Sequence, residues 1–86
     1  MRALPPGEIK GRVRSLRGPA LSARIEVLEL HEAVTSDASG RFRIDVPPGS
    51  YTLHISAEGH EPQQRSVEVE QNGVSILVID LRRSAK

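Results

Sequence analysis

Three histidines, His31, His54 and His60, are the side chains of this chain that can titrate near neutral pH or ligate a transition metal. A metal site requires two or three of them to converge, with Glu32 or Asp37 as an oxygen ligand. Their spacing matches neither the i, i+2 nor the i, i+4 pattern of common ligand motifs, and the stretch from His31 lacks the second histidine of a zinc-protease motif. The alternation around His54 places its ring on the solvent face of a strand. We therefore predict no metal site from the histidines.

Three aspartates and the serines are the next candidates for chemistry. Asp37, Asp45 and Asp80 lack the spacing of a calcium-binding loop, and Asp37 fits the role of a turn cap better than that of a ligand. No serine lies in a strand-to-helix elbow beside a suitable base. The chain has no cysteine, so disulfides and thiolate chemistry are excluded. The sequence predicts no catalytic residue, no metal and no cofactor.

Aromatic side chains are scarce, which limits the ligands that can be bound by stacking. The sequence holds one Phe and one Tyr, Phe42 and Tyr51, and the alternation directs both toward a core. Sugar rings and unpaired bases are commonly stacked on exposed aromatic rings. We expect no nucleic-acid partner, in agreement with a net charge of +1. A glycan or cell-wall polymer is an alternative ligand, and it would need a concave polar groove.

The segment from Ser36 to Leu53 carries the clearest structural signal. Apolar and charged residues alternate over 41–46, and apolar residues resume the alternation over 51–57, which predicts two strands with one face toward a core. Pro48 and Gly49 suit the two central positions of a type II turn, because Pro fixes a negative φ and Gly accepts a positive one. We therefore expect the two strands to pair as an antiparallel hairpin.

A tight turn is expected before this hairpin. The Asp37 carboxylate is placed to accept backbone N–H bonds there, and Gly40 is free to take a positive φ. Five further segments are expected to be strands, the segment 32–36 as a short one, and the parity of the apolar residues slips at Val27-Leu28, which indicates a β-bulge. These segments are 8–14, 23–27, 32–36, 63–70 and 74–81. Seven short strands, with no sustained helical period, predict an all-β sandwich or barrel without significant helix.

The order of these turns and strands resembles the carboxypeptidase regulatory-like domain, a transthyretin-like β-sandwich. The matching motifs are Gly11-Arg12-Val13, Gly18-Pro19-Ala20-Leu21-Ser22-Ala23-Arg24-Ile25, Thr35-Ser36-Asp37-Ala38-Ser39-Gly40-Arg41-Phe42, Pro47-Pro48-Gly49-Ser50-Tyr51-Thr52-Leu53 and Gly59-His60. They run from about Ile9 to Leu81. The resemblance implies a seven-stranded Greek-key β-sandwich without catalytic residues of its own. Such domains are usually attached to catalytic domains, outer-membrane receptors or bacterial envelope and surface proteins.

A related transthyretin-like family of hydrolases supplies the enzyme alternative. Its members act on a ureide product of urate oxidation, use conserved His and Arg residues and end in Tyr-Arg-Gly-Ser. This chain ends with residues 81–86, which share an Arg and a Ser with that motif but lack the Tyr and the Gly. The first predicted strand also carries no histidine. The residues therefore favour a protein that is not an enzyme.

The last predicted strand carries apolar residues on both faces, although a two-layer sandwich needs one apolar face per strand. One parity holds Leu77, Ile79 and Leu81, and the other holds Val74, Ile76 and Val78. If the first set faces the core, the second set lies outside and is a candidate interaction face. The alternative is that Leu4, Leu28 or Leu30 covers this outer face.

A basic stripe is expected on the outer side of the first strand. Lys10, Arg12 and Arg14 share one parity there, opposite the apolar residues of the same strand. Glu68 and Glu70 share the outer parity of the sixth strand. We expect these two carboxylates to pair with the stripe, as on an ordinary solvated surface of mixed charge.

The chain is long enough for one domain, and we divide it into a flexible lead-in (1–7), a β-sandwich domain (8–81) and a basic, frayed tail (82–86). No apolar run approaches the ~20 residues of a membrane span, and the N-terminus lacks the apolar stretch of a signal peptide. We favour a module of a longer extracytoplasmic protein in the periplasm, at the cell surface or secreted, with a cytoplasmic protein as the alternative. The expected partner is a protein or a neighbouring domain of the same polypeptide, without direct membrane insertion. A weak homo-oligomer is a further expectation.

Overall fold

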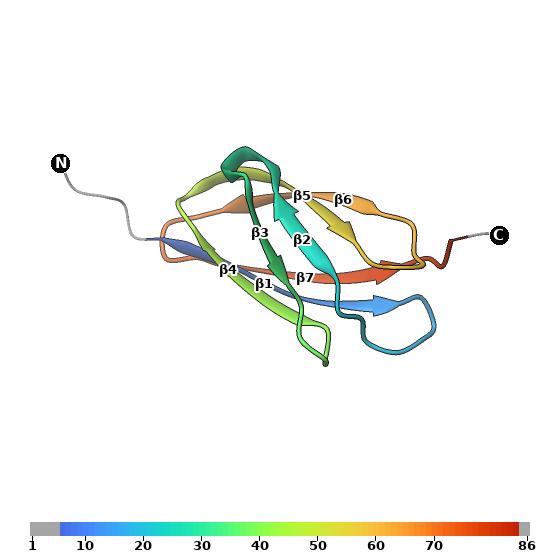
Figure 1. Cartoon of the computed structure of the whole chain (residues 1–86). Helices are drawn as coiled ribbons and strands as arrows, with labels where there is room; N and C mark the ends of the chain where they lie inside the picture. Colours follow the sequence, from blue (N-terminus) through green and yellow to red (C-terminus); the bar gives the residue numbers. More distant parts are fainter. Residues whose placement is uncertain (1–5, 85–86) are drawn as a thin grey trace.

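Two β-sheets packed face to face make up the computed structural model, which describes residues 6–84 (Figure 1). The strands are β1 (Gly7–Ser15), β2 (Arg24–Val27), β3 (Glu32–Thr35), β4 (Arg41–Val46), β5 (Gly49–Ser56), β6 (Gln63–Val69) and β7 (Val74–Leu81). The three-stranded sheet has the order β4-β1-β7, and the four-stranded sheet has the order β3-β2-β5-β6. Neighbouring strands are antiparallel except β1 and β7, which are parallel. The predicted seven-stranded β-sandwich is confirmed.

The core lies between the sheets and is built from branched aliphatic side chains. Burial follows the predicted alternation: in β4 the apolar residues Phe42, Ile44 and Val46 are buried, whereas the charged residues between them are exposed. Eight side chains have no exposed surface, namely Ile9, Val13, Ile25, Val27, Leu53, Ile55, Ile79 and Leu81. Each sheet thus turns one apolar face inward, as expected for aligned sheets that share a core.

The predicted hairpin of 41–46 with 51–57 is wrong, because β4 and β5 lie in different sheets. β4 pairs with β1, whereas β5 pairs with β2 and β6. Pro47 and Pro48 lack the N–H group that would continue a ladder, and they carry the chain from one sheet to the other. Gly49 has a φ of 155° and begins β5, so it does not occupy the centre of a type II turn. The Tyr51 hydroxyl donates to the Pro47 carbonyl and thereby fastens this crossover.

The Asp37–Gly40 turn shows why these two residue types stand there. Asp37 Oδ1 accepts hydrogen bonds from the backbone N–H groups of Ser39 (2.8 Å) and Arg41 (3.0 Å). Gly40 has a φ of 78°, and a Cβ at this position would lie 2.2 Å from the Val13 carbonyl oxygen. The turn therefore requires both the positive φ and the absence of a side chain.

The expected β-bulge at Val27-Leu28 is also wrong. β2 ends at Val27, and the chain leaves the sheet in a 3₁₀ turn, η1 (Leu28–Leu30), which His31 closes with a φ of 54°. Leu28 would otherwise face Thr52 on β5, since Val27 lies opposite Leu53. The parity slip therefore marks a strand end at which the backbone rotates away from the ladder.

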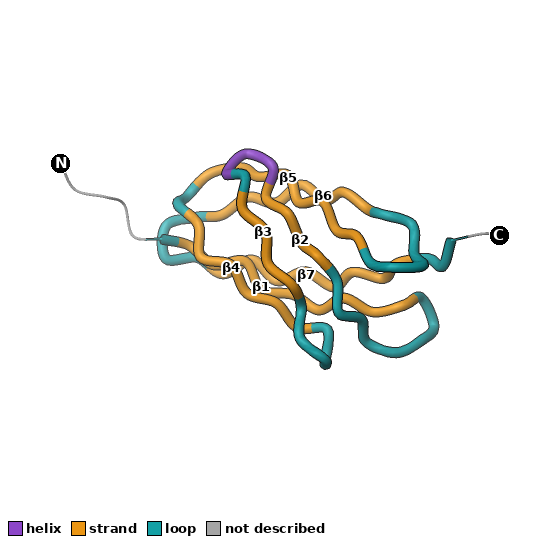
Figure 2. Tube along the Cα trace, in the orientation of Figure 1, coloured by secondary structure: helices purple, strands orange, loops and turns teal. Residues whose placement is uncertain are grey.

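Both ends of the domain form backbone contacts beyond the bounds expected from the sequence. Gly7 belongs to β1 and pairs with Val46, although the sequence placed it in the lead-in. The tail expected after Leu81 contacts the rest of the domain as far as Ser84, whose N–H donates to the Gly59 carbonyl (3.0 Å). Figure 2 shows this C-terminal segment beside the loop between β5 and β6. Residues 1–5, 85 and 86 lie outside the described residues. Over residues 6–84 no helix has the length and apolar character needed to span a bilayer.

Candidate interaction surface

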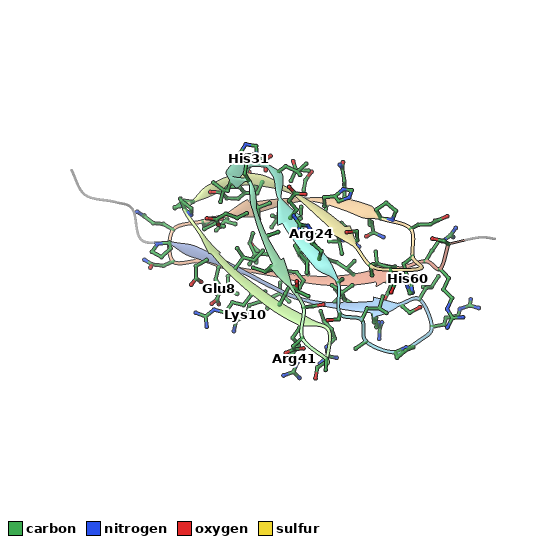
Figure 3. All side chains as sticks on the ribbon, viewed as in Figure 1. Glu8, Lys10, Arg24, His31, Arg41 and His60 are labelled. Carbon is green, nitrogen blue, oxygen red and sulfur yellow. The ribbon has the colours of Figure 1, made fainter. Side chains whose placement is uncertain are left out.

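The side chains with potential for chemistry are dispersed over the molecule. His31 lies beside η1, and His60 lies near the opposite end of the sandwich (Figure 3). His54 lies on β5 between Glu26 of β2 and Gln64 of β6. Within the described residues no group of three or more His, Cys, Asp or Glu side chains is close enough to hold a metal ion.

His60 has a structural role that occupies both of its ring nitrogens. Its Nε2 lies 3.0 Å from the Ser15 hydroxyl, and its Nδ1 lies 2.9 Å from the Glu58 carbonyl oxygen. The ring thereby joins the loop between β5 and β6 to the end of β1. Ser15 is 2% exposed, so the contact also supplies a partner for a buried hydroxyl.

The three aspartates serve separate local contacts. Asp37 caps its own turn, as described above. Asp80 accepts from Arg14 (Nε to Oδ1, 2.6 Å), and Asp45 lies 3.7 Å from the Arg43 Nε. The carboxylates thus do not converge on a shared site.

The outer face of the three-stranded sheet exposes the aliphatic residues of β7. Val74, Ile76 and Val78 are 55%, 74% and 56% exposed. On the other face of the same strand Ile79 and Leu81 are fully buried, and Leu77 packs against the core. Leu28 lies in η1 and Leu30 packs against the core, so neither covers the outer face. Leu4 is outside the described residues.

Charged residues on the neighbouring strands border this aliphatic column. The strand registers align them in three rows that cross the face from β4 through β1 to β7. The rows are Arg41–Arg12–Val78, Arg43–Lys10–Ile76 and Asp45–Glu8–Val74. Two rows therefore place two cations beside one aliphatic side chain, and the third places two carboxylates beside one.

Ion pairs on this face are unevenly distributed. Glu8 pairs with Lys10 (3.7 Å) and with Arg43, and Asp80 pairs with Arg14. The expected pairing of the basic stripe with Glu68 and Glu70 is wrong, because β6 belongs to the other sheet. Within residues 6–84, Arg12 and Arg41 form no ion pair although they lie directly opposite each other. Figure 3 shows Lys10 and Arg41 projecting on the same side of the molecule.

The two cationic rows line an open groove of about 700 Å³. The cations Lys10, Arg12 and Arg41 line it together with Ile76 and Val78. Asp37 lies at its border. The groove combines positive charge with aliphatic surface, which suits a ligand that is both anionic and apolar.

β7 is an edge strand, and its outward backbone groups lie beside the same residues. The Gly73 carbonyl accepts from the Glu8 N–H of β1 (2.9 Å), and the Leu81 carbonyl accepts from the N–H of Leu16, directly after β1 (2.8 Å), so the backbone groups of odd-numbered residues of β7 point toward β1. Backbone groups alternate along a strand, which directs those of Ile76 and Val78 away from β1. The Asp80 carbonyl follows this pattern and accepts from Gln63 Nε2 (3.2 Å), which closes the edge at its C-terminal end. The open part of the edge thus coincides with the exposed aliphatic residues.

The alternation of side chains along β7 identified the aliphatic column from the sequence. The position of Arg12 directly opposite Arg41 could not be read from the sequence. Both arginines were known to face outward from the alternation of their strands. Their adjacency depends on the β1–β4 register, which no turn sets because the two strands are far apart in the sequence. Glu29, which binds Thr52, was missed for the same reason.

The family model of the carboxypeptidase regulatory-like domain matches residues 8–82, and the chain belongs to this family. The fold is shared with a chain of the Bacillus anthracis TIE protein (TM-score 0.78, 18% identity), which it matches over 92% of its own length and 17% of the other. It is shared also with GBS52, the minor pilin of the Gram-positive pathogen Streptococcus agalactiae (TM-score 0.78, 16% identity), over 98% of this chain and 47% of that one. The chain therefore spans less than half of either protein structure. No curated protein matches it.

Proposed function

We propose that this chain is a non-catalytic β-sandwich module of a larger extracytoplasmic protein of the bacterial envelope or a secreted protein. In this role it docks a protein partner or a neighbouring domain through β7. The family and the two structural neighbours support the module, since in both neighbours a domain of this fold is a fraction of a longer chain. The main observation in favour of docking through β7 is that the Ile76 side chain is 74% exposed on an open sheet edge.

The energetics of β7 favour a covered strand. Full burial of an aliphatic side chain stabilises by about 1.5–3 kcal/mol, and Ile76 and Val78 leave most of that free energy unused. An unprotected apolar edge also pairs readily with other strands. A partner strand added to β7 would satisfy the outward backbone groups and extend the aliphatic column at the same time.

A glycan ligand has weaker support in the geometry. A polar hollow of about 340 Å³ lies on the four-stranded sheet and is lined by Glu29, Ser50, Thr52 and Ser66, among others. Its central carboxylate and hydroxyl bind each other, since Thr52 Oγ1 donates to Glu29 Oε2 (2.9 Å). Tyr51 borders the hollow but is buried, so it offers no stacking platform.

The docking function is tested with the double variant Ile76→Ser, Val78→Ser in the native protein that contains these residues. We expect docking to weaken at least tenfold, while the free energy of unfolding changes by about 1 kcal/mol or less, because both side chains are exposed. Leu28→Ser is the matched control, since it removes an exposed leucine outside this face. Native mass by light scattering and partner affinity are the measurements. Unchanged mass and affinity in the double variant would disprove docking through β7.

A further inference from the structure

The pairing of Arg12 with Arg41 points to the chemistry of the docking partner. Like charges directly opposite each other on neighbouring strands repel. The acids Glu8 and Asp80 neutralise Lys10 and Arg14 instead, so the two arginines face each other without a carboxylate within residues 6–84. Guanidinium groups bind carboxylates with paired N–H donors. Residues 6–84 therefore place two guanidinium groups where a carboxylate can bind, beside the aliphatic column.

The rows of the face set the spacing that a partner must match. Arg12 and Lys10 are two residues apart on β1, which corresponds to roughly 6.6 Å along the strand. Val78 and Ile76 stand beside them in the same two rows of β7. An extended segment repeats the side chains of one face at the same distance, so every second residue of the segment reaches the next row.

A continuous polyanion fits this face poorly. The cationic rows are bounded by Glu8 and Asp45 at one end and by Asp80 beyond Arg14 at the other. Asp37 also lines the groove. An anionic membrane or a nucleic acid would bring its charges against these carboxylates, whereas a single protein segment can place its acids over the arginines alone.

A second copy stacked on this face fits no better. A symmetric contact could supply carboxylates to Arg12 and Arg41 only by placing their row on the Glu8–Asp45 row of the other copy. Glu8 and Asp45 already form ion pairs with Lys10 and Arg43, so those carboxylates are engaged within their own copy. The observed charges therefore favour a partner of opposite sign over self-association.

We propose that the occupant of this groove is an extended protein segment that carries both carboxylates and aliphatic side chains. Its carboxylate lies between Arg12 and Arg41, and its aliphatic residues lie on Ile76 and Val78. This segment crosses the outer face of the sheet and is distinct from the part of the partner that pairs with the β7 edge, because Arg12 and Arg41 lie on β1 and β4. The inference rests on the proposed docking function of β7 and adds to it the composition of the segment that covers the face.

The test is selection of a displayed library of random dodecapeptides on the 86-residue chain, followed by affinity measurement of the selected peptides. We expect enrichment of Asp and Glu together with Val, Ile and Leu, and amide shifts in NMR spectra at Arg12, Arg41, Ile76 and Val78. Arg12→Gln and Arg41→Gln should each weaken binding at least tenfold. Arg24→Gln, an exposed arginine of β2 without an ion pair in residues 6–84, should leave affinity unchanged. Affinity should fall as salt screens the contact.

The outcomes separate this inference from the docking function. Selected peptides that are apolar but not acidic, and that still shift Ile76 and Val78, overturn the acidic partner and leave docking through β7 intact. No selected peptide, or peptides that bind elsewhere, overturns the inference as well. It is also overturned by binding of anionic vesicles through Arg12, or by a doubled mass in light scattering that Ile76→Ser abolishes.

Discussion

At the scale of single residues, backbone geometry explains the residue types found in the turn and in the crossover. Gly40 is required because its φ is 78° and because the Val13 carbonyl approaches within 2.2 Å of its missing Cβ. Asp37 caps the same turn, and Tyr51 fastens the crossover at Pro47. These residues therefore hold the backbone of the turn and of the crossover in place.

Comparison of Gly40→Ala with a control variant separates the free-energy cost of a positive φ from that of a steric clash at this turn. We expect a loss of unfolding free energy of at least ~2 kcal/mol, because the alanine meets both an unfavourable φ and a backbone oxygen. Gly59→Ala is the matched control, since Gly59 has a φ of 74° but nothing within 4 Å of its Cβ position. It should cost about 1–2 kcal/mol from the φ alone. Chemical denaturation measures both, and equal losses would contradict the role given to the Val13 carbonyl.

The same scale shows the limit of sequence reasoning about the surface. The period of two in β1, β4 and β7 states which side of the sheet each residue faces, and it placed Arg12, Arg41 and Ile76 outward. It does not state which outward residues are neighbours. That information lies in the register of strands that are distant in the sequence, and so the candidate site was predicted only as separate parts.

At the scale of elements, strand ends depend on side chains that replace missing ladder partners. β2 ends at Val27, which lies opposite Leu53, so β2 supplies no residue opposite Thr52. Glu29 of η1 takes this place, and its carboxylate accepts a hydrogen bond from the Thr52 N–H (2.7 Å). The hydrogen bond from the Thr52 backbone lowers the pKa of Glu29. A carboxylate from a 3₁₀ turn thus completes the edge of the β5 ladder.

The lowered pKa of Glu29 makes this contact pH-dependent. A group whose pKa is lower in the folded state stabilises fully above its ordinary value of 4.5, and the contribution is lost as pH falls through the folded pKa. Glu29→Gln should therefore lower Tm at pH 7 and differ less from the parent below pH 4. Glu32→Gln, for which residues 6–84 supply no side-chain hydrogen bond, is the control. A Tm difference that persists unchanged into acid would contradict the carboxylate's role.

The elements themselves were largely predictable, whereas their partners were not. Alternation located all seven strands to within a few residues, because one apolar face per strand is the condition for a sandwich. The 41–46 and 51–57 strands were expected to pair, yet Pro47-Pro48 connects two sheets. A turn-forming sequence between two alternating segments is compatible with either arrangement, since both reverse the chain.

At the scale of the whole molecule, the two sheets use their inner faces to make one core and leave two outer faces to solvent. The four-stranded sheet has a polar hollow on its outer face. The three-stranded sheet exposes an aliphatic column on an open edge, bordered by Arg12 and Arg41, which form no ion pair within residues 6–84. We interpret this difference between the two outer faces as a docking surface on the three-stranded sheet, as proposed for a module within a larger protein.

Backbone amide exchange at β7 shows whether a partner covers this edge strand in the native protein. The amides of Ile76 and Val78 are compared between the protein purified under native conditions from its source and the isolated 86-residue chain, with the buried Leu53 as internal reference. We predict exchange at least tenfold slower in the native protein at Ile76 and Val78, with an unchanged rate at Leu53. Equal rates for all three amides in both samples would contradict the claim that β7 is a docking edge.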